Sequence, residues 1–217
     1  MVFMSDSERA AGLAREHGVD AGLHLNFTSP FSSPDCSAVL REYQRKLGEY
    51  LMLHALVRAV FHPGLSNAFD YVVKAQLEEF ARLFGNPERI DGHHHMHLCA
   101  NVLFKGLLPL GTVVRRNFFF FPGEKSAANR FYRKAMDRRL ARRHRIVDYL
   151  FNLAPLEPRE RLERICTLAR QNVVEVETHP ANAHEYQFLM GEEVARWTNG
   201  VQIARDFVLT RQEPKIV

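Results

Sequence analysis

Short apolar segments that run directly into histidine occur three times in this chain, and their order constrains the fold more than any other feature. The segments are VDAGLHLNFT (19–28), ERIDGHHHMH (88–97) and VVEVETHPA (173–181). Helix-like stretches separate them, so strands and helices alternate along the chain. This alternation favours a parallel α/β sheet or barrel. Because no repeat or linker interrupts it, we predict one domain over residues 1–217.

Helical periodicity and helix-ending residues predict the other elements. An N-cap at Ser5 or Asp6 begins a first helix that ends near Gly18. The longest amphipathic stretch, 67–84, stops at the sequence Gly-Asn-Pro. The same criteria predict helices at 101–108, 130–145, 157–171 and 191–197, a buried strand at 112–115, and a closing segment at 201–209.

Composition narrows the class of protein. The 217 residues carry a formal net charge of +4, which is too weakly basic by itself to indicate a nucleic-acid partner. Cys36, Cys99 and Cys166 are odd in number and far apart, so they predict reduced thiols in a cytoplasmic protein. No apolar run approaches the roughly 20 residues of a membrane span. The polar start does not resemble a signal peptide.

Ionisable side chains gather at the ends of the three predicted strands, where the active site of a (β/α) barrel lies. Strand alternation puts Glu175, Glu177 and His179 on one face. If alternation continues through the second segment, the residues on one face there are Asp91, His93, His95 and His97. Polar groups that point inward need partners. Three strand ends with such groups therefore indicate a functional site.

Each feature also has a simpler structural interpretation. A lone His24 on a half-buried strand is more often a hydrogen-bonded core histidine. The cluster at 93–97 is compatible with a solvated loop or, less well, with a tag remnant. His179 before Pro180 is compatible with a turn. The coincidence at three strand ends favours the functional interpretation.

The motifs GLHLNFT (22–28), DGHHHMH (91–97) and VEVETHPA (174–181) resemble, in order and spacing, three motifs of the YdjC-like carbohydrate deacetylases. The helix end LFGNP, the arginine of TVVR and the segment IVDYLFNL are also similar, so the resemblance covers nearly the whole chain. It implies a (β/α) barrel-like fold, a deformed TIM-type barrel. It also implies a metal-dependent hydrolase that removes acetyl groups from N-acetylated sugars.

The resemblance implies a role for each matching residue. One divalent metal ion, Mg²⁺ or Zn²⁺, would be bound by His24 and His93, and His179 would be the general acid. Arg115 matches an arginine near the substrate, and Asp91 would accept a hydrogen bond from a metal-binding imidazole. The remaining residues expected to contact the sugar or to support the site are Asn26, His94, His95 and His97.

One family motif is missing from the sequence. The family begins with a strand ending in Asn-Ala-Asp-Asp-Phe-Gly, whose two aspartates serve as general base and metal ligand. We therefore expect an N-terminally truncated domain, or a short paralogue with two metal ligands where catalytic sites normally have three. Glu175 or Glu177 is an alternative source of the missing oxygen ligand. We predict weak or absent metal binding and weak or absent deacetylase activity.

Two other classes of function stay open. One is a non-catalytic paralogue that binds a metal or a sugar. The other is nucleic-acid binding through the basic stretch 130–145, although charges on all sides of a predicted helix with few aromatic neighbours favour a solvated surface. A missing first strand would leave a sheet edge unpaired, which predicts a homodimer. The expected ligand is an N-acetylated oligosaccharide or glycolipid sugar.

Overall fold

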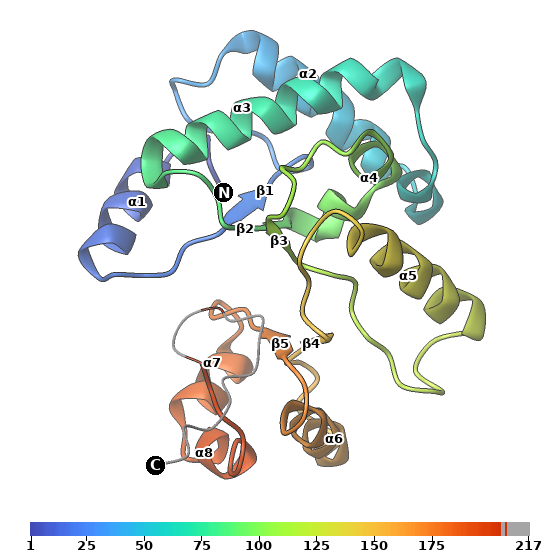
Figure 1. Cartoon of the computed structure of the whole chain (residues 1–217). Helices are drawn as coiled ribbons and strands as arrows, with labels where there is room; N and C mark the ends of the chain where they lie inside the picture. Colours follow the sequence, from blue (N-terminus) through green and yellow to red (C-terminus); the bar gives the residue numbers. More distant parts are fainter. Residues whose placement is uncertain (205–206, 208–217) are drawn as a thin grey trace. The chain divides into compact units, whose positions relative to one another are not determined.

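The computed structural model describes residues 1–204 and 207, and these form two compact units (Figure 1). Unit 1 comprises Met1–Arg115 and Arg138–Arg145, and unit 2 comprises Arg116–Asp137 and the described residues from Ile146 onward. Helix α5 (Ala127–Leu140) begins in unit 2 and ends in unit 1. The single domain over residues 1–217 stays a prediction.

Unit 1 is built on a three-stranded parallel sheet. Its strands lie in the order β1 (Leu23–Leu25), β2 (Arg89–Gly92) and β3 (Val113–Val114). In the register of β1 and β2, His24 lies opposite Asp91. Because neighbouring parallel strands point the same way, their carboxyl ends meet at one edge of the sheet. The register therefore brings the first two histidine motifs of the sequence together.

Helices cover this sheet with an apolar face. The α-helices of unit 1 are α1 (Ser7–Glu16), α2 (Ala38–Met52), α3 (Ser66–Phe84) and α4 (Ala100–Lys105), and the 3₁₀ helices are η1 (Ala55–Ala59), η2 (Pro63–Leu65) and η3 (His93–Leu98). Helices α2 and α3 lie side by side (Figure 1). Phe27, just after β1, packs its ring 5.5 Å from that of Phe69 on α3. Gly85 ends α3 with a φ of 89°, which favours glycine, so the predicted helix stop is confirmed.

A buried amide joins the end of β1 to α3. The Gln76 side chain accepts a hydrogen bond from the Asn26 backbone N–H at 2.7 Å and donates to the Asn26 carbonyl at 3.0 Å. Both residues are fully buried. Gln76 thus supplies the backbone partners that a neighbouring strand would otherwise provide to Asn26. The loop that follows His24 is held in place by this pair.

Unit 2 contains a two-stranded parallel sheet, β4 (Tyr149–Asn152) and β5 (Val174–Glu177), with α6 (Arg159–Ala169) between the two strands in the chain. Helices α7 (Ala183–Met190) and α8 (Glu193–Trp197) follow. The core of unit 2 consists of Phe121, Phe151, Leu153, Leu162, Ile165 and Phe188. An isolated pair of strands is marginally stable in water, so this apolar core is what holds β4 and β5 together.

The predicted fold class is confirmed at the level of a mixed α/β protein with parallel strands. In the part of the chain that the structure describes, the strands form two sheets and no closed barrel, so the barrel-like fold stays a prediction. The three cysteines are buried and form no disulfide within the described residues. No helix within the described residues has the length and apolar character needed to span a bilayer.

Several helix boundaries differ from the sequence predictions. The basic helix predicted at 130–145 spans Ala127–Leu140, and the helix predicted at 157–171 spans Arg159–Ala169. Helix α2 lies in a stretch that had no assignment, and α7 precedes the predicted helix near 191–197. Part of the predicted closing segment, 201–209, lies outside the described residues.

Replacing Gln76 by methionine should strongly destabilise unit 1. The change keeps the side-chain volume but leaves the Asn26 N–H and C=O without partners, at about 1–3 kcal/mol for a buried group. We expect a loss of about 2–4 kcal/mol in urea denaturation. Lys74→Met, at an exposed position of the same helix, should stay within about 0.5 kcal/mol of wild type. Equal stability of the two variants would contradict this role of Gln76.

Candidate functional site

The Asp91 carboxylate lies at the centre of the candidate site in unit 1. Its Oδ1 is 2.7 Å from His24 Nδ1, and its Oδ2 is 2.5 Å from Arg115 Nη1. The side chains of Asp91 and Arg115 are each 18% exposed, and that of His24 is 34% exposed. The three residues come from β1, from β2 and from the position directly after β3. One carboxylate therefore ties together the ends of three neighbouring strands.

The charge of Asp91 depends on these partners. Burial alone would raise the pKa of the carboxyl group, but the hydrogen bond with His24 and the charge of Arg115 outweigh it and lower the pKa to about 2. The carboxylate is therefore ionised at neutral pH and can only accept hydrogen bonds. It follows that His24 donates from Nδ1, which leaves the lone pair of a neutral ring on Nε2. A carboxylate fixes metal-binding histidines in this tautomer.

His93 and His94 lie beside His24. The His93 ring centroid is 5.7 Å from that of His24 and 3.9 Å from that of His94. Partial burial, followed by the nearby His94 and His24, lowers the pKa of His93, so its ring is held in the neutral form that can bind a cation. His94 is exposed, and its Nδ1 is 3.0 Å from the hydroxyl oxygen of Thr28.

The chain turns sharply inside the histidine cluster instead of continuing as a strand. His94 and His95 have φ values of 53° and 56°, in the left-handed region, and η3 contains both residues. The condition for Asp91, His93, His95 and His97 to share one strand face is therefore not met. The turn begins at Gly92, where an added Cβ would lie 2.8 Å from His97 Nδ1. Only glycine leaves room for the ring to fold back onto the strand.

His97 has a structural place beneath the site. It is fully buried, and its Nε2 donates to the Arg115 carbonyl at 2.8 Å. Its Nδ1 has no hydrogen-bond partner within the described residues. Burial lowers the pKa of His97 to about 4, because the hydrogen bond with Arg115 offsets only part of the desolvation. The neutral ring thus positions the backbone of the residue whose side chain holds Asp91.

Asn26 and His95 occupy different surroundings. Asn26 is fully buried, and its side chain bonds the backbone of its own turn: Nδ2 donates to the Ser29 carbonyl, and Oδ1 accepts from the N–H groups of Thr28 and Ser29. Its amide is therefore committed to shaping the loop after β1. His95 is half-buried, with its ring centroid 6.2 Å from that of His97.

His179 belongs to unit 2 and follows β5. Its side chain is 60% exposed, and its Nε2 is 3.3 Å from Glu177 Oε1. Its backbone N–H donates to the buried Glu185 carboxylate at 2.8 Å. The chain after β5 is thus fixed through its backbone while the imidazole stays accessible to solvent. The predicted common face of Glu177 and His179 is compatible with their contact.

The residues present fit half of a metal site. His24 and His93 are adjacent, and His24 is held in the metal-binding tautomer. Across residues 1–204 and 207, however, no three histidine, cysteine, aspartate or glutamate side chains are grouped so as to hold a metal ion. Catalytic zinc sites normally supply three protein ligands. A complete ligand set is therefore not found in the described part of the chain.

These features define an α/β protein with a histidine-rich site at the carboxyl ends of parallel strands. The chain belongs to the YdjC-like protein family, whose model matches residues 1–200, so the predicted family is confirmed. It is similar to a crystal structure from Enterococcus faecalis V583, provisionally described as a cellobiose-phosphate cleavage protein. The identity is 16% and the TM-score 0.58, over 90% of this chain and 80% of that one, which shows the fold alone. No protein of curated function matches the chain.

Sequence reasoning missed how Arg115 and His97 work together. A place for Arg115 near a substrate stays a prediction; its guanidinium contacts Asp91 and its carbonyl accepts a hydrogen bond from His97. The left-handed turn at 94–95 has no reliable signal, because histidine carries a Cβ and only tolerates that region. Gly92 was the available clue, since a glycine next to a large buried ring indicates close approach.

Lowering the pH from about 6.5 to about 4 should reduce the free energy of unfolding through His97. The histidine pKa is 6.5 in its ordinary state and about 4 in the folded chain, so between these values the unfolded chain binds more protons. The expected loss is on the order of 3 kcal/mol, measured by urea denaturation at neutral pH and near the lower value.

A matched pair of variants isolates this effect. His97→Gln keeps a donor for the Arg115 carbonyl but cannot titrate, so its stability should depend less on pH. His17→Gln, at an exposed position, should keep the wild-type dependence. A wild-type slope in His97→Gln would rule out this assignment.

Proposed function

We propose that this chain acts on N-acetylated sugars at the His24–His93 site, with deacetylation as its reaction and slow turnover. The observation that carries the proposal is the Asp91 carboxylate, which presents His24 Nε2 beside His93. Its support is membership of a carbohydrate-processing family, together with a structural neighbour described by the cleavage of a sugar phosphate.

A single divalent ion, Mg²⁺ or Zn²⁺, would be held by His24 and His93. Two imidazoles on one tetrahedral zinc ion have ring centroids about 5–6 Å apart, and the observed separation is 5.7 Å. Such an ion polarises an amide carbonyl and lowers the pKa of water. Because the described residues supply only two ligands, binding should be weak, and no step of the reaction is assigned to the ion.

The protein's own residues divide into two groups in this proposal. Those that can touch a ligand are the accessible imidazoles: His94 as a sugar contact and His179 as the proton donor to the departing amine. Asp91, Arg115 and His97 form the support, since each contacts another residue of the site. Asn26 shapes the loop after His24. His95 is placed with the supporting residues because its ring lies beside that of His97.

A non-catalytic sugar-binding relative is the second candidate, and the incomplete ligand set favours it. Nucleic-acid binding through the basic stretch is less favoured. Arg133 stacks over Phe120 at 4.9 Å, and Arg139 stacks over Phe104 at 4.2 Å. Both guanidinium groups therefore already cover aromatic rings of their own unit. The homodimer stays a prediction.

Zinc binding should depend on both imidazoles. In calorimetric titrations with ZnCl₂, His24→Ala and His93→Ala should each abolish binding, since a single imidazole is a poor site. Asp91→Asn should weaken binding by about 10–100-fold, because it removes the charge that fixes His24. His17→Ala is the control at an exposed position. Unchanged zinc affinity in His24→Ala would exclude this pair as the site.

A variant of His179 distinguishes the proposed reaction from sugar binding alone. We expect slow release of acetate from N,N′-diacetylchitobiose, and we expect His179→Ala to abolish that release while sugar binding persists. His184→Ala, an exposed histidine on α7, should keep wild-type release. Fast metal-dependent release by the wild-type chain would contradict the slow turnover. Undiminished release by His179→Ala would contradict its role as proton donor.

A further inference from the structure

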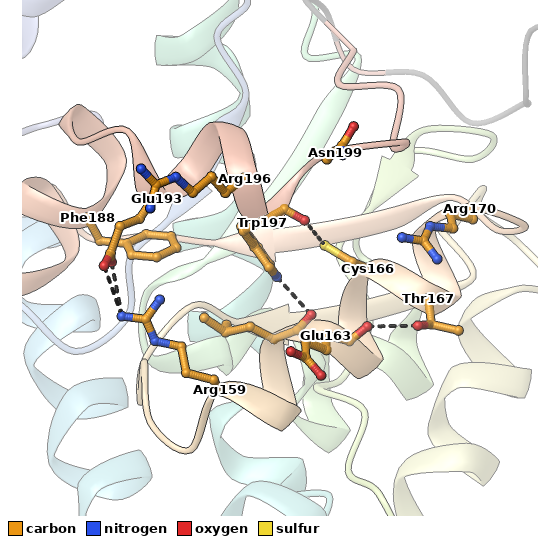
Figure 2. Close-up of a pocket in the computed structure, with 11 residues that line it drawn as sticks. Arg159, Glu163, Cys166, Thr167, Arg170, Phe188, Glu193, Arg196, Trp197 and Asn199 are labelled. Carbon is orange, nitrogen blue, oxygen red and sulfur yellow. Dashed lines mark hydrogen bonds and ion pairs between the residues drawn. The ribbon is translucent and has the colours of Figure 1, made fainter.

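Unit 2 contains a cavity that has no residue in common with the histidine site. Its volume is about 540 Å³, within the range of roughly 300–1,000 Å³ typical of small-molecule sites. Helix α6 forms one wall, and residues of α7, α8 and the turn after α8 form the rest. Figure 2 shows the side chains that line it.

An aromatic residue in a fixed position forms the apolar part of the cavity. The Trp197 indole N–H donates to the Leu162 carbonyl at 2.8 Å, and the Trp197 carbonyl accepts from Cys166 Sγ at 3.0 Å (Figure 2). The Trp197 ring centroid is 5.8 Å from that of Phe188. These contacts hold the ring to α6 and α7 and leave it only partly buried. A fixed aromatic face of this kind can stack on the C–H face of a ligand.

Positively charged, negatively charged and uncharged polar side chains surround this ring. Arg159 forms two contacts of 3.1 Å with the Glu193 carboxylate, so that their charges offset each other (Figure 2). The other polar residues of the lining are Glu163, Thr167, Arg170, Arg196 and Asn199. The cavity therefore offers hydrogen-bond donors and acceptors side by side around an apolar face.

This combination selects among classes of ligand. The lining carries three arginines and two glutamates, so a simple anion would meet the carboxylates of Glu163 and Glu193 as well as the arginines. A purely apolar molecule would face five ionised side chains. A hydroxyl group is both donor and acceptor, so it can satisfy the glutamates and the arginines alike. A sugar has such hydroxyls around a ring with apolar faces, which suits the Trp197 surface.

We propose that the cavity lined by Trp197 binds a neutral sugar unit through its own set of residues. The ligand class agrees with a carbohydrate-processing family, but the binding does not require the deacetylation reaction or the His24–His93 pair. Trp197 stacks on the ring, and Glu163 and Asn199 bond its hydroxyls. The site serves to retain a saccharide rather than to transform it.

The chain contains its own probe of this cavity, because Trp197 is its single tryptophan. Titration of the full chain with cellobiose and with N,N′-diacetylchitobiose should give a saturable change in tryptophan emission for at least one of them. No change with either sugar would overturn the proposal. A saturable change with inorganic phosphate at similar concentrations would overturn the choice of a neutral ligand.

Variants on one helix test the placement of the ligand. Glu163→Ala removes an acceptor from the cavity and should weaken the sugar by about tenfold, the loss expected for a hydrogen bond to a charged group. Glu160→Ala removes the same charge from an exposed position of α6 outside the lining and should leave the affinity unchanged. Equal affinities in the two variants would overturn the proposal.

The histidine site serves as a second control. The double variant His24→Ala, His93→Ala should lose zinc binding and keep the sugar-dependent change in Trp197 emission. If this double variant loses the emission change, the sugar binds at the histidine site and the cavity proposal fails. If zinc binding fails in the wild-type chain while the emission change persists, the proposed function fails and the cavity proposal stands.

Discussion

The contacts of one carboxylate, that of Asp91, with the His24 imidazole and the Arg115 guanidinium decide the arrangement of the strand ends in unit 1. The Asp91 side chain is mostly buried, and burial without charged or hydrogen-bonding partners would favour the protonated form of its carboxyl group. His24 and Arg115 keep it ionised, and each of them depends on another contact: the strand register for His24 and the His97 hydrogen bond for the Arg115 backbone. Removing one partner would therefore disturb the others, because Asp91 and Arg115 are mostly buried and can draw on little water in its place.

The histidines of the DGHHHMH segment differ in surroundings, and the turn at η3 is the reason. A continued strand would have put alternate rings on one face with similar burial. The left-handed residues at 94 and 95 instead leave His93 beside His24, His94 exposed beside Thr28, and His97 under the site. One short segment thereby supplies a candidate ligand, a candidate sugar contact and a neutral structural ring. Sequence alone cannot separate these roles, because the residue type is the same in each.

The sequence predicted what depends on periodicity and on helix-ending residues. The long helix α3 and its stop at Gly85 follow from local rules, and so does the alternation of strands and helices. The predictions failed where the apolar pattern is mixed, as in α2, where an element is short, as in α7, and where distant groups decide, as at the strand face that ends at Gly92. Partners such as Gln76 for Asn26 are 50 residues apart, and no local pattern connects them.

Helix α7 contacts both the residue proposed as proton donor and the cavity of unit 2. Glu185, buried on this helix, accepts the His179 backbone N–H and also the Asn182 side-chain amide. Phe188, three residues later, lines the cavity and packs against Trp197. Residues three apart on a helix are neighbours on one face of it. The position of the His179 backbone and the shape of the cavity at Trp197 are therefore set by the same helix. A sugar that alters the packing of Phe188 acts on the element that fixes the proposed proton donor.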